Sequence, residues 1–194
     1  MAVSKDDKYS KILNAAIEII SEKGLDKTSI SDIVKKAGIA QGTFYLYFSS
    51  KMALVPAIAD NLLTITFQRI NDKLKGKKDI ESVLEVLVDE TFSITDEYRD
   101  VLILCYSGFA LDRSLETWGT IYKPFYEWME DVLVKAINQQ AIFSDIDVKW
   151  TAKMIITLVE ATSERYYSSD QKNVAPDEYK AEILRFCKRS LGIQ

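Results

Sequence analysis

Residues 28–51 read TSISDIVKKAGIAQGTFYLYFSSK, and this stretch decides the fold of the N-terminal part of the chain. Its first half has four apolar residues at helical spacing, which predict a short helix with one buried face: Ile30, Ile33, Val34 and Ala37. Gly38 follows them and permits a tight reversal of the backbone. A second short helix is expected over residues 40–48, so the stretch as a whole predicts a helix-turn-helix.

The second of these helices has an apolar side and a polar side. Phe44 and Phe48 are four residues apart, so they share one face and can anchor the helix to the core. Four polar side chains then lie on or near the outward face: Gln41, Thr43, Tyr45 and Tyr47. Amide, hydroxyl and phenol groups on a short exposed helix suit the major groove of DNA, and Gly42 allows a close backbone approach. The alternative is that the four aromatic residues simply fill the core.

The remainder of the chain also reads at helical period, and no convincing strand or repeat is present. We expect helix boundaries at Gly24, Asp79, Asp147 and Pro176, which are residues that end, cap or begin helices. A long helix is expected from Ser49 or Ser50 to about residue 74, with Pro56 and its kink in the interior. The prediction is an all-α protein of about nine helices.

The amino-acid composition argues against several classes of function. The 194 residues include no histidine, so the commonest general base and metal ligand is missing, and we expect neither an enzyme nor a metal or cofactor site. Cys105 and Cys187 stand in unrelated contexts and are expected to be reduced thiols. With no signal peptide and no membrane-spanning run visible, the expected location is the cytoplasm. Residues 1–51 carry eight lysines against six acids although the whole chain has a net charge of −4, which suits an end that faces phosphate.

The segment around the second helix resembles the TetR family of transcriptional regulators. The matching residues are Ala37-Gly38-Ile39, Gly42-Thr43-Phe44-Tyr45-Leu46-Tyr47-Phe48 and Ser50-Lys51, within a region of strong similarity over about residues 8–55. The resemblance implies a three-helix DNA-binding domain over residues 1–50 and a helical effector-binding and dimerisation domain over residues 51–194. It further implies that Gln41, Thr43 and Tyr45 face bases, and that Thr28, Tyr47 and Lys51 contact phosphates.

The function implied is that of a repressor. A homodimer would bind a palindromic double-stranded DNA operator and be released by a small hydrophobic or aromatic effector. The alternative is a DNA-binding protein of the same fold that has no small-molecule effector and is controlled by a protein partner or has an architectural role. Two departures from the family pattern matter. Ala40 replaces a frequent capping serine, and the first 51 residues contain no arginine for guanine recognition, which favours A/T-rich half-sites.

Aromatic residues are dense between residues 92 and 126. Trp118, Tyr122 and Tyr126 recur every four residues and so line one helix face. The resemblance places the effector pocket in this region, for which we name six residues: Phe92, Tyr106, Phe109, Trp118, Tyr122 and Tyr126. Ordinary core packing is the alternative for each of them. Glu160 and Glu164 interrupt a mostly apolar helix and either meet a cationic ligand or stay solvated.

The last two predicted helices resemble the dimerisation bundle of the family. Six residues of these helices are the expected interface residues: Met154, Leu158, Ala161, Ile183, Phe186 and Cys187. No membrane partner is expected.

Overall fold

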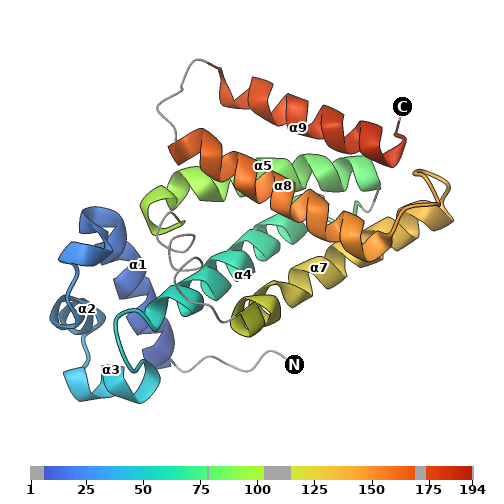
Figure 1. The fold of residues 1–194 in the computed structure, drawn as a ribbon. Helices are drawn as coiled ribbons and strands as arrows, with labels where there is room; N and C mark the ends of the chain where they lie inside the picture. The colour runs from blue at the N-terminus through green and yellow to red at the C-terminus, as the bar shows by residue number, and fades with distance from the viewer. Residues whose placement is uncertain (1–6, 78, 103–114, 169–173, 194) are drawn as a thin grey trace. The chain divides into compact units, whose positions relative to one another are not determined.

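The computed structural model describes residues 7–77, 79–102, 115–168 and 174–193, and every regular element in these ranges is a helix (Figure 1). The all-α prediction is confirmed. The helices are α1 (Asp7–Lys27), α2 (Ile30–Ala37), α3 (Gln41–Tyr47), α4 (Leu54–Leu74), α5 (Ile80–Glu97), α7 (Leu115–Asn138), α8 (Val148–Ser168) and α9 (Pro176–Leu191). None of the described helices is long and apolar enough to cross a bilayer.

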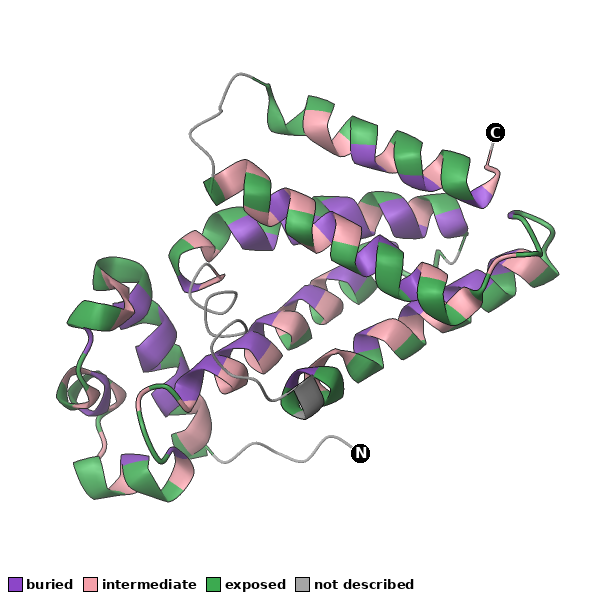
Figure 2. Cartoon of the chain, in the orientation of Figure 1, coloured by how far each residue is buried: buried purple, intermediate pink, exposed green. Residues whose placement is uncertain are grey.

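The chain forms two compact units. The first unit comprises residues 1–62 and 98–118, and the second comprises residues 63–97 and 119–194. Helix α4 contributes residues to both units. In each unit, buried residues recur along one side of the helices and exposed residues along the other, as the helical period of the sequence requires (Figure 2).

The first unit contains the predicted helix-turn-helix. Helix α1 packs against α2, and α2 packs against α3. The side chains of Ile12, Ile33 and Phe44 are wholly buried, so each of the three helices contributes to one small core. Gly24 adopts φ 78° and interrupts the helical backbone of α1, which agrees with the expected stop at this residue.

Helix α2 has the strongest local signals of the chain. Ser29 caps its N-terminus by accepting a hydrogen bond from the Asp32 amide at 3.1 Å, and the Asp32 carboxylate accepts one from the Ser29 amide at 3.0 Å. Both donors would otherwise lack a partner, so this capping box fixes where the helix begins. Gly38 ends it in the left-handed conformation at φ 67°. The turn between α2 and α3 is therefore determined by residues that are close together in the sequence.

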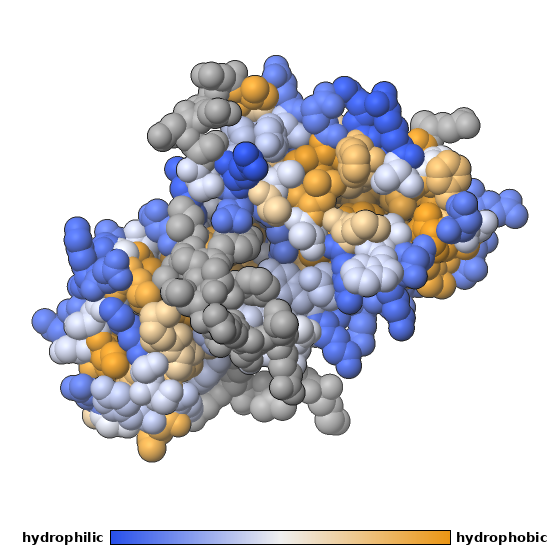
Figure 3. All heavy atoms as spheres, viewed as in Figure 1, coloured by the Kyte–Doolittle hydropathy of each residue, from blue (hydrophilic) through white to orange (hydrophobic). Residues whose placement is uncertain are grey.

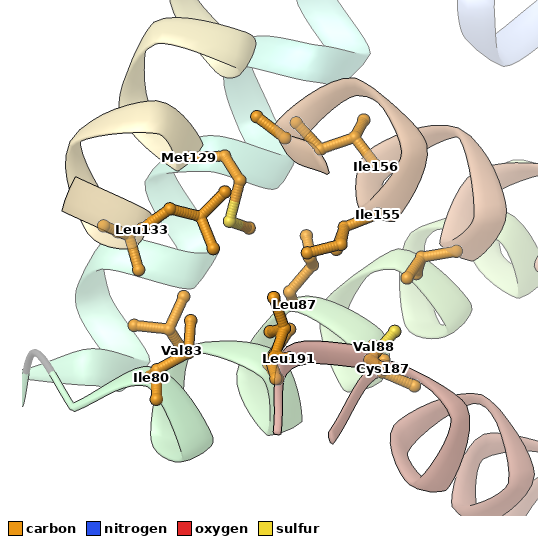
Figure 4. Packing of buried hydrophobic residues seen from close by; sticks show 14 of the residues in the cluster. Ile80, Val83, Leu87, Val88, Met129, Leu133, Ile155, Ile156, Cys187 and Leu191 are labelled. Atoms are coloured by element: carbon orange, nitrogen blue, oxygen red, sulfur yellow. The ribbon is translucent and has the colours of Figure 1, made fainter. Parts of the chain in front are cut away.

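The second unit holds the main hydrophobic core. Helix α5 lies against both α8 and α9, which also contact each other. Figure 4 shows Val83 and Leu87 of α5 pointing toward Met129 and Leu133 of α7 and Ile155 of α8. Ion pairs on the rim reinforce the α5–α9 contact, with Lys188 Nζ 2.7 Å from the Glu81 carboxylate and Lys180 Nζ 3.1 Å from that of Asp89.

Three predicted helix starts in the second unit are confirmed. The Asp79 carboxylate accepts a hydrogen bond from the Ser82 amide at 2.8 Å, and that of Asp147 accepts one from the Trp150 amide at 3.0 Å. Pro176 is the first residue of α9, where its missing N–H costs nothing. Short-range capping chemistry therefore located these boundaries correctly.

The expectation for Pro56 was wrong. Helix α4 begins at Leu54, so Pro56 lies in its first turn and not in its interior. The residues before it already use tight turns, with the Leu54 and Val55 amides donating to the carbonyls of Lys51 and Met52. A proline at this place removes no interior helical hydrogen bond. Pro124, in contrast, does lie inside α7.

Candidate nucleic-acid interface and effector region

Helix α3 is held by its phenylalanines and presents its other side to solvent. Phe44 is wholly buried and Phe48 is 5% exposed, whereas Tyr45 is 51% exposed. Gln41 is exposed, and a Cβ added to the exposed Gly42 would meet no atom within 4 Å. The alternative in which all four aromatic residues fill the core is therefore wrong, because Tyr45 lies at the surface. The outward face carries no charge of its own.

Aromatic contacts fix the orientation of α3. The Phe48 ring stacks on the Tyr9 ring of α1, with centroids 5.4 Å apart. The Tyr47 ring meets the Tyr9 ring edge-on, with centroids 6.1 Å apart. Tyr47 is consequently half-buried, and only part of its ring faces solvent. Ala40 has extended backbone angles but provides no side-chain cap, as expected. Sequence reasoning missed Leu46, which is 82% exposed on this helix.

Thr28 and Lys51 lie elsewhere than expected. Thr28 is 2% exposed, and its hydroxyl donates to the Gly24 carbonyl at 2.7 Å. Lys51 Nζ donates to the carbonyls of Leu25 at 2.7 Å and of Thr28 at 2.8 Å. Lys51 thus joins the segment before α4 to the end of α1 and to Thr28, which follows it. A phosphate contact by the Thr28 side chain is thus a wrong expectation, because that side chain is sealed inside the first unit.

Ion pairs engage several of the lysines at this end of the chain. Lys11 pairs with Asp7, Lys23 with Asp32, and Lys36 with Glu18 and Glu22. The hydrogen bond from Lys23, followed by those from Ser29, holds the pKa of the Asp32 carboxyl far below its usual range. These pairs leave the net charge of residues 1–51 unchanged, since the acids are already counted, but they engage Lys11, Lys23 and Lys36 with carboxylates.

Four of the six residues expected at the effector pocket are described, and the structure brings Tyr122 and Tyr126 together. Tyr106 and Phe109 lie outside the described residues. Phe92 is wholly buried in the second unit among the rings of Tyr166, Tyr167 and Tyr179, with centroids 6.0 to 6.4 Å away. It is a packing residue between α5, α8 and α9, so the core alternative applies to it. Trp118 is buried and belongs to the first unit.

Tyr122 and Tyr126 are brought together. Their rings stack with centroids 5.6 Å apart, and both side chains are half-buried. The Tyr122 side chain hydrogen-bonds to the carboxylate of Glu160 in α8, and burial, opposed by this hydrogen bond, raises the pKa of Glu160 to about 8. Burial also raises the pKa of Glu164, one turn further along. The expectation from the sequence for these two carboxyls, a cationic ligand or solvent, did not include the contact of Glu160 with Tyr122.

A separate surface groove of about 210 Å³ lies in the second unit between α4, α5 and α7. Its floor is apolar and includes Leu74, Val83 and Trp128, while Lys77 and Lys135 stand at its rim. None of the predicted effector residues lines it.

The expected dimerisation residues divide into two sets. Met154 is 59% and Phe186 62% exposed, and apolar side chains gather over α8 and α9 on the face seen in Figure 3. Ala161 is exposed and Leu158 half-buried. Ile183 and Cys187, however, are 6% and 0% exposed and belong to the core of the same chain, so naming them as interface residues was wrong. Trp150, 64% exposed, was missed.

Comparison with known proteins identifies the family. Residues 12–58 match the model for bacterial regulatory proteins of the tetR family, and residues 84–191 match the tetracyclin repressor-like C-terminal domain. The chain belongs to the TetR family. It is therefore a transcriptional regulator with a helix-turn-helix.

Relatives and solved structures agree with this assignment. The TetR chain is 58% identical over 185 residues to an uncharacterised HTH-type transcriptional regulator of Bacillus subtilis, YvdT, with 95% of each protein covered. It is 27% identical over 173 residues to the fatty acid metabolism regulator protein of the same organism, covering 87% of this chain and 88% of that one. The structure of the regulator FadR from B. subtilis in complex with stearoyl-CoA matches with a TM-score of 0.73 and 25% identity, covering 92% of this chain and 97% of that one. FadR from Bacillus halodurans shares the fold with a TM-score of 0.76 at 20% identity, and 95% and 96% of the two chains are covered.

Proposed function

We propose that this protein is a ligand-responsive repressor that binds a palindromic operator as a homodimer. The observation that carries the proposal is the uncharged polar face of α3, where Gln41 and Tyr45 reach solvent while Phe44 holds the helix in the core. A rigid helix with amide and phenol groups outward is suited to base edges in the major groove. Thr43 and Tyr47 are half-buried and contribute from the border of this face.

Lys51 has a positioning role in this proposal. Its amino group is used by two backbone carbonyls of the α1–α2 segment, so it stabilises the arrangement of helices that α3 depends on. Nonspecific attraction to phosphate then comes from side chains such as Lys27 and Lys35, which are exposed.

The dimer contact of the proposal uses α8 and α9. Trp150, Met154 and Phe186 expose large apolar side chains there, and such a surface is stabilised when a second copy covers it. A two-fold contact between identical faces pairs two recognition helices with two half-sites.

The effector binds in the second unit and reduces operator affinity. If it prefers a form of the dimer that binds DNA poorly, the two binding events are coupled by about 1–3 kcal/mol, which changes operator affinity several-fold to a hundred-fold. A hydrophobic or aromatic effector fits the exposed edges of Tyr122 and Tyr126. The stearoyl-CoA complex of the related FadR supports a small-molecule effector in this fold.

The experiment is operator binding by variants that differ at one amide. We expect Gln41→Ala to weaken binding to DNA from upstream of the protein's own gene by about 5- to 100-fold, which is the range for one lost bidentate base contact. Gln139→Ala removes an equally exposed amide from the second unit and should leave affinity unchanged. Fluorescence anisotropy at two salt concentrations measures both. Equal affinities for the two variants would contradict the role of α3.

A further inference from the structure

One carboxylate in the second unit is surrounded by groups from two helices. Glu160 of α8 accepts a hydrogen bond from Tyr122 of α7. Tyr126, one turn along α7, hydrogen-bonds to Thr157, which lies three residues before Glu160 and so on a neighbouring part of the same helix surface. The two helices are thus bridged by polar contacts on either side of a single acidic group.

This carboxylate has no positive partner among the residues that the structure describes. Other acidic side chains of the unit do have one, since the buried Glu90 pairs with Lys73 and Glu97 lies 2.7 Å from Arg69. Among the described residues, the Glu160 carboxyl has one hydrogen-bond partner, Tyr122, and burial raises its pKa to about 8. Removing a carboxylate from water without a counter-charge costs stability, so a neutral side chain would serve packing better at this position.

The neighbouring rings are suited to a cation. Tyr122 and Tyr126 stack at 5.6 Å, and the faces of aromatic rings attract positive charge. The Lys153 amino group already lies 5.8 Å from the Tyr126 centroid and 5.3 Å from that of Trp150. Glu160 and both tyrosines are only half-buried, so solvent still reaches part of each. The cluster therefore combines one carboxyl group, whose ionised form a bound cation would stabilise, with two aromatic rings and access from outside.

We propose that Glu160, Tyr122 and Tyr126 form the binding site for an organic monocation, a protonated or quaternary amine whose nitrogen lies between the carboxylate and the rings. This inference rests on the proposed function, because the cation is taken to be the effector that releases the operator. It also separates this chain from the related regulator that binds stearoyl-CoA. The phosphates of a coenzyme A ester would gain no attraction from this carboxyl group, and its ionised form would repel them.

The same groups do not suit a metal ion. No cluster of three or more acidic, cysteine or histidine side chains that could hold a metal is present in the part of the chain that is described. Two aromatic walls and a single carboxylate are instead the chemistry that recognises an alkylated ammonium group.

The test compares two molecules of the same shape, choline and its uncharged isostere 3,3-dimethylbutan-1-ol. Calorimetry and thermal unfolding of the full-length dimer measure binding, with equal sodium chloride as the ionic-strength control. We expect choline to bind at least tenfold more tightly than the isostere. Glu160→Gln should weaken choline binding at least tenfold, while Glu127→Gln, an exposed carboxylate of α7, should bind as the unmodified protein does.

Tyr122→Phe keeps the ring but removes the hydroxyl that contacts Glu160, and should retain most of the affinity for choline. If the Gln variant is poorly folded, Glu160→Asp serves instead, because it keeps the carboxyl group on a side chain that is one methylene shorter. We then expect the affinity for choline to fall several-fold. Undetectable choline binding at 100 mM, equal binding of the isostere, or undiminished binding by the Gln variant would overturn the inference.

Operator release is measured in parallel. A protein that binds its operator and ignores the cation overturns only this inference. A protein that binds the cation through Glu160 but has no affinity for DNA overturns the proposed function and leaves the cation site standing. Release of the operator by choline from the unmodified dimer, and not from the Gln variant, is the result expected if both are correct.

Discussion

At the scale of single residues, Glu160 and Lys51 show how burial changes the role of a charged side chain. Lys51 reads in the sequence as a cation for phosphate, but its amino group is used by two backbone carbonyls inside the first unit. Glu160 reads in the sequence as an interruption of an apolar helix that meets either a cationic ligand or solvent, yet its side chain contacts Tyr122 and burial raises its pKa. In both cases the surroundings, which come from residues distant in the chain, decide the chemistry.

Glu160 makes stability depend on pH in a predictable direction. Its pKa is about 8 in the folded protein against 4.5 for an unperturbed glutamate, so between these values the folded state binds more protons than the unfolded state. Stability contributed by the neutral form is complete below about pH 4.5 and is lost as the pH rises through 8. Glu160→Gln should therefore be more stable than the unmodified protein at pH 8 by about 1–2 kcal/mol, a value reduced for its partial exposure.

Thermal unfolding of both proteins from pH 5 to pH 9 checks this, with Glu127→Gln as the control at an exposed site. The difference between Glu160→Gln and the unmodified protein should grow with pH. A difference that is constant over the range would show that Glu160 is ionised throughout.

At the scale of elements, α2 and α3 differ in how their ends are stabilised. Helix α2 has a complete capping box and a left-handed glycine, whereas α3, only seven residues long, begins at Ala40 without a side-chain cap. So short a helix is not stable by itself and depends on packing. The burial of Phe44 and Phe48 supplies that packing, which explains why α3 forms despite its missing cap.

The missing cap predicts a stabilising substitution. Ala40 already has the extended backbone of a capping residue, so Ala40→Ser should accept a hydrogen bond from an amide of the first turn of α3 and add about 0.5–2 kcal/mol. Thermal unfolding of the whole chain, followed by the helical circular dichroism signal, measures the effect. Ala181→Ser, in the exposed interior of α9, should instead be neutral or slightly destabilising. Equal changes in unfolding temperature for the two variants would argue against a capping effect at Ala40.

At the scale of the whole molecule, α8 and α9 carry large apolar side chains that a single chain leaves exposed to solvent. Met154 and Phe186 are each more than half exposed, and we propose that a second copy covers them. Phe186→Glu should place a charge in that contact and shift the protein toward monomer, with operator affinity reduced because two half-sites are no longer bound together. Val134→Glu, at an exposed apolar position of α7, should remain dimeric.

Sedimentation velocity over a hundredfold range of concentration distinguishes these results. If Phe186→Glu still formed a dimer with an unchanged dissociation constant, the dimer contact would lie elsewhere. A monomer that still bound its operator as tightly as the unmodified protein would contradict the proposed coupling of dimerisation to DNA binding.

The amino-acid sequence by itself determined the helical class, the helix-turn-helix and most helix ends, because these depend on apolar period and on capping groups within a few residues of each other. Ser29, Asp79, Asp147 and Pro176 act over such short distances. Only the tertiary structure decided which side chains are buried and which are exposed to solvent and free to contact a ligand or DNA. Thr28, Cys187 and Phe92 are enclosed by segments far away in the chain, and Glu160 meets Tyr122 across two helices. Burial and charge pairing arise from long-range packing, which helical period alone does not specify.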